Sequence, residues 1–333
     1  MKLLNRSPIA RTSITVAVSV AGLGLAALIN GALARRAERQ NPPRGKFIEV
    51  DGVKLHYIEK GVGSPVVLLH GNQALADDFE ISGVVDSIAG THRVIAFDRP
   101  GFGHSERPRD RVWTASAQAK LIRKALIGLG VERPVLVGHS WGTLVALALA
   151  IEHPGDARGL LLLSGYYFPS KRLDVAIASL PAIPVLGDLL RYTISPLLGW
   201  LIGPLFLKTI FAPSNVADRF KRRFPFSMAL RPSQIKATAG DAALMVPAAA
   251  RLKDRYRDLV LPVAIMAGGG DKVVSVEPQA MRLHGLVRQS TLEIIEGTGH
   301  MVHYASPAKV AAKVEALCAS PHAGDVCRRV VTL

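Results

Sequence analysis

The segment VLVGHSWG, residues 135–142, is a short apolar run that ends in Gly-x-Ser-x-Gly and leads into an alanine- and leucine-rich segment. This order predicts a strand, a tight turn and a helix. Gly138 and Gly142 lack the side chains that would collide where strand and helix crowd together, and the turn is expected to hold Ser140 in a strained backbone conformation. Ser140 would then stand at the top of a sheet. Because a serine hydroxyl is a poor nucleophile alone, such a site also needs a base, a carboxylate and N–H donors for an oxyanion.

The composition indicates a folded chain with a large core. Of the 333 residues, 49% are hydrophobic and 20% are charged, which excludes global disorder and fits one large α/β domain with an insertion. The formal net charge of +15 predicts attraction to anionic surfaces, unless the basic residues are spread over a solvated face. No zinc-finger spacing or RNP-like aromatic signature is present, so we expect no nucleic-acid partner and favour acidic membrane lipid.

Residues 1–40 predict a membrane anchor or a signal segment. Lys2, Arg6 and Arg11 precede an apolar run over residues 14–34, which reaches the roughly 20 residues that a membrane span needs. The run is longer than a usual signal core, which favours a retained anchor. The alternative is a secreted protein cleaved near Ala34, where the sequence resembles a signal-peptidase site. Basic residues flank the run on both sides, so the positive-inside rule says little about orientation.

The two cysteines both lie near the C-terminus. Cys318 and Cys327 do not have a metal-binding spacing, and no cysteine lies near residues 135–142, which excludes a thiol nucleophile there. In an oxidising compartment they could close a small loop, and two unpaired thiols are the alternative. A bridge would favour the exported side of a membrane, periplasmic or extracellular, over the cytoplasmic face.

Apolar runs alternate with helical patterns along most of the chain, which predicts a mostly parallel sheet with helices on both faces. The expected strands are residues 46–50, 53–58, 66–69, 94–97, 135–139, 159–163, 263–267 and 292–295, and the expected helices are residues 114–130, 143–153, 278–286 and 307–318. The alternation lapses in a helical, proline-punctuated stretch. The predicted divisions are an anchor or signal segment (1–40), the first part of the core (41–164), a helical lid insertion (165–259), the second part of the core (260–319) and a tail (320–333).

Four residues lie just beyond the carboxyl ends of predicted strands, where catalytic groups of α/β sheets collect. They are Asn72, Ser140, Asp271 and His300, and the order Ser, Asp, His along the chain is that of an α/β-hydrolase triad. With the segments HGN (70–72), DRPGFGHS (98–105) and GTGH (297–300), residues 46–318 resemble the α/β-hydrolase fold superfamily, in its serine-nucleophile, lidded esterase or lipase branch.

The resemblance implies a role for each residue. Ser140 would attack a carbonyl carbon, His300 would act as general base and then acid, and Asp271 would hold the histidine tautomer. The backbone N–H groups of Asn72 and Trp141 would form the oxyanion hole. No metal and no organic cofactor is implied.

Each assignment has a structural alternative. Asp271 could be a turn or cap residue, because aspartate favours such positions. His303 is a rival for the role of His300, while His139 and His104 are expected to be structural. The serine also limits the chemistry: epoxide hydrolases and haloalkane dehalogenases of this fold use a carboxylate there, and a serine would form an ether that water does not cleave.

The expected activity is hydrolysis of a carboxylic ester with a hydrophobic acyl or alcohol part. Within the insertion, residues 194–211 are apolar but interrupted by proline and glycine, which predicts short helices rather than a span, and a basic cluster follows at 221–223. An anchor, an apolar lid and a basic cluster suit an enzyme that takes esters from a lipid surface. The alternatives are an acyltransferase or cofactor-independent haloperoxidase-like enzyme using the same triad, or a catalytically idle, membrane-tethered binding protein. The sequence does not indicate an oligomeric state.

Overall fold

The computed structural model describes residues 8–320, with side chains from residue 15 onward. Within these residues the strands form one eight-stranded sheet in the order β1-β2-β4-β3-β5-β6-β7-β8. The strands are β1 (Lys46–Val50), β2 (Val53–Lys60), β3 (Ser64–Leu69), β4 (His92–Phe97), β5 (Val135–His139), β6 (Gly159–Leu163), β7 (Val263–Gly268) and β8 (Ser290–Ile295). The β1·β2 and β2·β4 pairs are antiparallel, and all strands from β4 to β8 run parallel. The predicted α/β architecture is confirmed.

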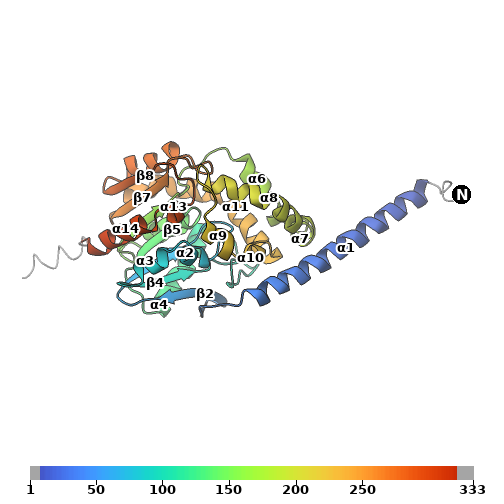
Figure 1. Cartoon of the computed structure of the whole chain (residues 1–333), viewed down its shortest axis with the longest axis horizontal. Coiled ribbons are helices and arrows are strands. Elements are labelled where there is room, and N and C mark those ends of the chain that lie inside the picture. Colours follow the sequence, from blue (N-terminus) through green and yellow to red (C-terminus); the bar gives the residue numbers. More distant parts are fainter. Residues whose placement is uncertain (1–7, 321–333) are drawn as a thin grey trace, which may run out of the picture.

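Helices cover both faces of the sheet (Figure 1). Those of the core are α2 (Asp77–Ile81), α3 (Val84–Ile88), α4 (Ala115–Gly128), α5 (Gly142–Glu152), α12 (Arg282–Leu286), α13 (Val302–Ala305) and α14 (Pro307–Ala319). The Thr114 side chain caps α4 by accepting a hydrogen bond from the backbone N–H of Ala117 at 3.1 Å. The expected helix over 278–286 is divided into a π-helical turn, η3 (Glu277–Met281), and α12. The short helices α2 and α3 were not predicted.

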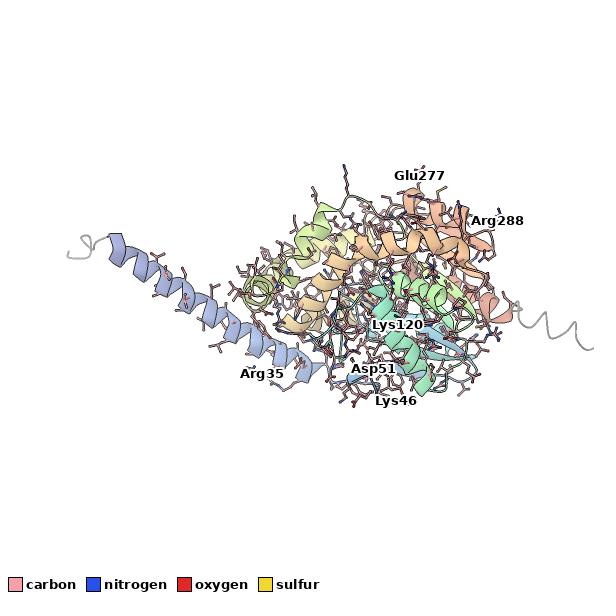
Figure 2. All side chains as sticks on the ribbon, turned by 180° about the vertical axis from the view of Figure 1, so that it is seen from behind. Arg35, Lys46, Asp51, Lys120, Glu277 and Arg288 are labelled. Atoms are coloured by element: carbon pink, nitrogen blue, oxygen red, sulfur yellow. The ribbon has the colours of Figure 1, made fainter. Side chains whose placement is uncertain are left out.

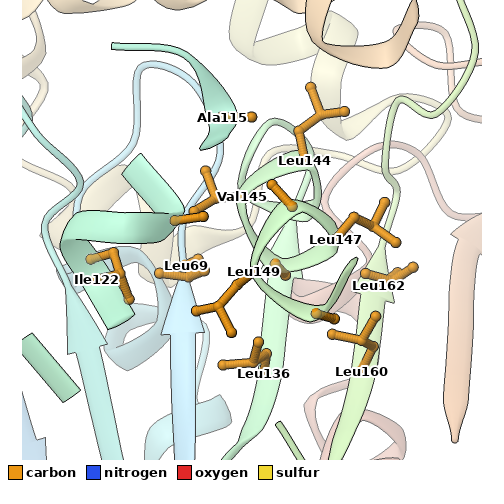
Figure 3. Close-up of a cluster of buried hydrophobic side chains, with 14 of the residues drawn as sticks. Leu69, Ala115, Ile122, Leu136, Leu144, Val145, Leu147, Leu149, Leu160 and Leu162 are labelled. Carbon is orange, nitrogen blue, oxygen red and sulfur yellow. The ribbon is translucent and has the colours of Figure 1, made fainter. Parts of the chain in front are cut away.

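Helix α5 is the centre of the larger hydrophobic core. It lies across β3, β5 and β6, and its leucines pack against the leucines of these strands (Figure 3). Leu144, Leu147 and Leu149 on the helix are fully buried, as are Leu136 and Leu160 on the strands. A helix that is apolar on every side is expected only where both of its faces are covered, so the residues after the Gly-x-Ser-x-Gly turn are held by packing.

The predicted insertion contains the remaining helices. They are α6 (Leu173–Ala178), η1 (Leu180–Ala182), α7 (Leu186–Tyr192), α8 (Ile194–Phe211), α9 (Asp218–Arg223), α10 (Phe226–Ala229), α11 (Pro232–Leu252) and η2 (Lys253–Asp258). The expectation of several short helices over residues 194–211 is wrong, because α8 is one continuous helix. Pro196 lies in its first turn, where a missing N–H is tolerated. Gly199 and Gly203 are sites of close packing: a Cβ atom there would collide with the side chains of Leu230 and Phe226.

Helix α1 (Pro8–Gln40) extends away from the body of the molecule, with Arg35 at the end nearer the core (Figures 1 and 2). Within residues 8–320, two helices are long and apolar enough to cross a membrane, namely α8 and the part of α1 from Thr15 to Gln40. Asn30 Nδ2 donates to the carbonyl oxygens of Tyr192 and Thr193, both at 2.9 Å, and so joins α1 to the insertion. The helix is therefore suited to anchor the protein in a membrane.

Two sequence predictions concern the chain ends. Cys318 lies in α14, but Cys327 lies outside the described residues, and the proposed pairing of the two stays a prediction. The division of the chain into residues 1–40, 41–164, 165–259, 260–319 and 320–333 also stays a prediction.

Candidate active site

Ser140 occupies the tight turn between β5 and α5, with a φ angle of +51°. This left-handed conformation is unusual for a residue other than glycine. The turn is possible because the backbones approach closely on either side: a Cβ atom on Gly138 would lie 2.7 Å from Thr143 Cα, and one on Gly142 would lie 2.7 Å from the carbonyl oxygen of His70. The strained serine and the need for both glycines agree with the prediction.

Asp271 and His300 meet beyond the carboxyl ends of β7 and β8. Asp271 Oδ2 lies 2.7 Å from His300 Nδ1, and Asp271 Oδ1 accepts hydrogen bonds from the backbone N–H groups of Val273 and Val274 at 2.7 and 2.9 Å. Both side chains are buried. The carboxylate is thus held by its own loop and can orient the imidazole and fix its tautomer.

The rival histidine has a different partner. His303 Nε2 lies 2.9 Å from Asp78 Oδ2, and the other Asp78 oxygen accepts a hydrogen bond from the Tyr304 hydroxyl at 2.7 Å. His303 and Asp78 are fully buried, so this pair belongs to the interior. The structure therefore favours His300 over His303 as the histidine that Asp271 orients.

His139 connects the nucleophile turn to His300. Its Nε2 atom lies 3.1 Å from the carbonyl oxygen of His300, and the two ring centroids are 5.0 Å apart. Burial, followed by the charges of His303 and His300, lowers the pKa of His139 well below its usual value, so this ring stays neutral. Within residues 8–320 no hydrogen bond joins Ser140 Oγ to His300, and catalytic hydrogen bonds often form only when a substrate binds. The catalytic roles of the three residues stay predictions.

The two predicted oxyanion donors lie on neighbouring loops, after β3 and after β5. Neither the Asn72 nor the Trp141 backbone N–H donates a hydrogen bond to another residue of the described chain. The Asn72 side chain donates to the carbonyl oxygen of Thr238 at 3.1 Å, and the Trp141 indole N–H donates to that of Asp241 at 2.8 Å. Both loops are thus attached to α11 through their side chains, while their backbone N–H groups have no acceptor among the described residues.

A buried ion pair near this site was not predicted from the sequence. Arg99, in the loop after β4, and Asp241, in α11, are both fully buried, and Arg99 Nη1 lies 2.6 Å from Asp241 Oδ2. The guanidinium also lies over the Trp141 ring, with Cζ 4.7 Å from the ring centroid. A signal was present in the sequence, because Asp241 is a single carboxylate in an alanine-rich helix, but its partner is 142 residues away.

Arg99 and His70 orient the predicted oxyanion donor. Arg99 Nη2 donates to the Gly71 carbonyl oxygen at 3.0 Å, and His70 Nδ1 lies 2.7 Å from the same oxygen. That carbonyl and the Asn72 N–H belong to one planar trans peptide group, so fixing one fixes the direction of the other. Arg99 Nε also donates to the His70 carbonyl oxygen at 2.8 Å. The direction of the Asn72 N–H is therefore set by the buried, charged network that binds the carbonyl oxygen of the same peptide group.

One buried cluster has a composition that could bind a metal ion. Asp78, His139 and His303 each place a potential ligand atom within 4.8 Å of the others. Both Asp78 oxygens already accept hydrogen bonds, from His303 and Tyr304. We therefore describe the cluster as a hydrogen-bonded support beneath the nucleophile turn and assign no metal to it.

Comparisons with known proteins agree with this geometry. A family model described as alpha/beta hydrolase fold matches residues 64–307. The chain is 33% identical over 157 residues to 2-hydroxymuconate semialdehyde hydrolase from Pseudomonas putida. The aligned segment covers 46% of this chain and 56% of the relative. The chain is 28% identical over 132 residues to haloalkane dehalogenase 2 from Mycobacterium tuberculosis, with 40% and 46% covered. The alignments thus span about half the length of these relatives.

A solved structure extends the comparison to most of the chain. The crystal structure of a membrane phospholipase A, described as a bacterial virulence factor, superposes with a TM-score of 0.63 at 19% identity. The match covers 93% of this chain and 97% of that one. At this level of identity the likeness concerns the fold.

Proposed function

This chain belongs to the alpha/beta hydrolase fold family, and on that premise we propose that it is a membrane-anchored serine hydrolase of carboxylic esters with a hydrophobic acyl or alcohol part. The observation that carries the proposal is the pair of Asp271 and His300, 2.7 Å apart at the carboxyl edge of the sheet, beside the strained turn that holds Ser140. The family's members include hydrolases of several kinds, and a serine at the nucleophile position favours those that cleave an ester over those that cleave a carbon–halogen bond.

The reaction follows from the roles of the site residues. Ser140 Oγ attacks the ester carbonyl carbon while His300 accepts its proton, and the N–H groups of Asn72 and Trp141 stabilise the oxyanion. The alcohol leaves with a proton from His300, and water activated by His300 then cleaves the acyl-enzyme. Asp271 stabilises the imidazolium in both steps. A haloalkane would instead leave Ser140 as an ether, so we do not extend the dehalogenase activity to this chain.

The apolar surface supports a hydrophobic substrate delivered from a membrane. Side chains on α7 and α8 that are apolar and largely exposed include Leu186, Leu189, Leu197, Leu201 and Leu205. They lie on the insertion that Asn30 of α1 contacts. An exposed apolar patch next to a membrane anchor favours contact with the lipid surface. We place the catalytic domain on the exported side, and the alternatives are secretion after cleavage near Ala34 or attachment to the cytoplasmic face.

Fluorophosphonate labelling of the full-length protein tests the nucleophile. We expect one adduct on Ser140 by peptide mapping, and none in Ser140→Ala. Ser164→Ala is a matched control, because Ser164 also follows a strand, also has a positive φ (+45°) and is buried without a hydrogen-bond partner for its hydroxyl among the described residues. Labelling that persists in Ser140→Ala, or disappears in Ser164→Ala, would contradict the assignment.

Substrate screening tests the reaction class. Hydrolysis of p-nitrophenyl esters should rise with acyl chain length, and 2-hydroxymuconate semialdehyde is the second substrate to screen, because the relative from Pseudomonas putida is named for it. Added alcohol tests for acyl transfer, and added peroxide together with bromide tests for haloperoxidase chemistry. Ester exchange would indicate an acyltransferase, and bromination of an added acceptor would indicate a haloperoxidase-like enzyme. A folded protein that shows neither adduct nor turnover, with and without lipid, would be a binding protein.

A further inference from the structure

A cavity of about 920 Å³ lies between the loop after β4, helix α11 and the end of α1, and no triad residue lines it. Helix α11 forms part of the wall of this cavity. Ser233, Lys236 and Gly240, spaced three or four residues apart, line the cavity and so share one helix face. Asp241 is buried and does not itself line the cavity, and its carbonyl oxygen accepts a hydrogen bond from Trp141 next to the nucleophile. Helix α11 thus contacts both the cavity and the nucleophile turn, and no residue of the triad belongs to the cavity wall.

The lining of the cavity is strongly basic. Two carboxylates, Glu38 and Glu106, line it together with six cationic side chains, which are Arg107, Arg109, Arg111, Arg191, Arg231 and Lys236. These cations come from the loop after β4, from α7 and from α11, so the tertiary structure brings three separate segments together. Such a wall attracts anions.

Arg231 and Arg111 each have a carboxylate of their own, Glu38 at 2.9 Å and Asp110 at 2.8 Å, whereas two other carboxylates are shared between arginines. Asp188 lies 2.6 Å from Arg191 and 3.4 Å from Arg109. Asp241 is divided between Arg107, at 2.9 Å, and the buried Arg99. Each of these two carboxylates therefore compensates less than one charge of each arginine, and positive charge remains in the cavity.

Lys236 carries the clearest excess charge. In the described chain its ammonium group forms no ion pair. Partial burial lowers the pKa of Lys236, and the positive charges of Arg109 and Arg191 lower it further. A cation that is partly desolvated among other cations is stabilised when an anion binds. The cavity therefore has both the charge and the volume for an anionic group.

The cavity also lies close to the predicted membrane surface. Glu38 of α1 lines it, five residues after the exposed apolar Leu33, which corresponds to about 8 Å along the helix axis. The polar headgroup layer of a bilayer is roughly 5–8 Å thick on each side. When α1 spans a membrane, the end of the cavity at Glu38 is therefore at headgroup depth, and the exposed Leu186 and Leu189 of α7 lie on the same insertion that Asn30 of α1 contacts.

We propose that this cavity binds the phosphate group of an anionic phospholipid from the membrane that holds α1, at a site separate from the triad. The phosphate would accept charge-assisted hydrogen bonds from Lys236, Arg109 and Arg107, while the lipid chains remain among the apolar side chains of α1 and α7. The occupant of this site is a ligand that need not be hydrolysed, so the proposal does not depend on the reaction at Ser140.

Calorimetric titration of the full-length protein in nonionic detergent tests the site. The probe is dihexyl phosphatidylglycerol with ether linkages, which has no carboxylic ester and cannot be consumed at Ser140. The ether-linked phosphatidylcholine analogue and inorganic phosphate serve as comparison probes. We expect Lys236→Gln to weaken phosphatidylglycerol binding about tenfold, as for loss of one charge-assisted hydrogen bond. Lys236→Arg should retain binding.

Lys253→Gln is the control, because it removes the same charge from a partly exposed position outside the cavity. Tm values equal to that of the wild type show that all three variants are folded, and hydrolysis of a soluble p-nitrophenyl ester should be unchanged in them. Wild-type affinity in Lys236→Gln, or an equal loss in Lys253→Gln, would overturn the site. Inorganic phosphate binding as tightly as the lipid, or phosphatidylcholine binding as tightly as phosphatidylglycerol, would overturn the assignment to an anionic lipid.

Discussion

Replacing Asp241 with asparagine tests the buried network that positions the predicted oxyanion donor. The substitution keeps the shape of the side chain but removes the negative charge that compensates Arg99. Both side chains are fully buried, and Arg99 Nη1 lies 2.6 Å from Asp241 Oδ2. Removing one partner of a buried ion pair costs about 3–5 kcal/mol, and we take the lower end because asparagine can still accept a hydrogen bond. The unfolding entropy of about 300 folded residues is about 0.6 kcal/mol/K, so a loss of about 3 kcal/mol lowers Tm by about 5 °C.

The same substitution should also reduce catalysis. Arg99 donates to the Gly71 carbonyl oxygen, whose peptide group carries the Asn72 N–H, and the Asp241 carbonyl oxygen binds Trp141. Complete loss of one oxyanion donor costs about 10²–10³ in kcat. A donor that is only misdirected should cost less, and we expect kcat to fall about tenfold with KM little changed.

Thermal unfolding and p-nitrophenyl ester kinetics of the purified protein measure both effects. The control is Asp254→Asn, because Asp254 is 78% exposed and its contact with Lys253 is a surface ion pair, which contributes about 0–1 kcal/mol. A Tm for Asp241→Asn within about 2 °C of the wild type, together with unchanged kcat, would refute the reasoning about this network.

Three further predictions address the turn, the pH response and the membrane surface. Gly142→Ala should destabilise the fold, because the added Cβ atom would collide with the backbone of β3, which precedes the oxyanion loop. Gly285→Ala is the control, because the space around Gly285 is open. Equal Tm values for the two variants would contradict this prediction. Burial, and next the charge of the neighbouring arginine, lower the pKa of His70 to about 4, so the folded state favours the neutral ring. The contribution of His70 to the free energy of unfolding should then be constant above about pH 6.5 and fall by roughly 3 kcal/mol down to about pH 4, and urea unfolding across this range should show a smaller fall in His70→Asn. Leu201→Asp should slow hydrolysis of esters in vesicles but not of soluble esters, because Leu201 is 74% exposed on α8. Val62→Asp is the control: Val62 is 80% exposed outside the insertion, and its substitution should affect neither reaction. Equal behaviour of the two variants would contradict contact between α8 and the membrane.

Much of the fold could be predicted because its signals are local. Apolar strand runs and the turn chemistry of residues 138–142 depend on neighbours a few positions away, so the eight strands were placed within a few residues of where they lie. The candidates Ser140, Asp271, His300, Asn72 and Trp141 were found for the same reason, since each follows a strand. Helix α8 was predicted wrongly because glycine and proline are typical of helix interruptions. In the structure the helix continues past Pro204, and its glycines pack closely against Leu230 and Phe226.

The remainder depends on contacts between residues far apart in the chain. The sequence alone determined that a serine in a Gly-x-Ser-x-Gly turn would leave a strand, and that an aspartate and a histidine would follow later strands. The pairing of Asp271 with His300, and of Asp78 with His303, follows from the packing of loops that are distant in the chain. The tertiary structure also brought Asp241 to Arg99 and gathered the basic side chains of three segments around one cavity. Charge pairing acts through space and carries no local periodicity, so a linear pattern cannot assign partners more than a hundred residues apart.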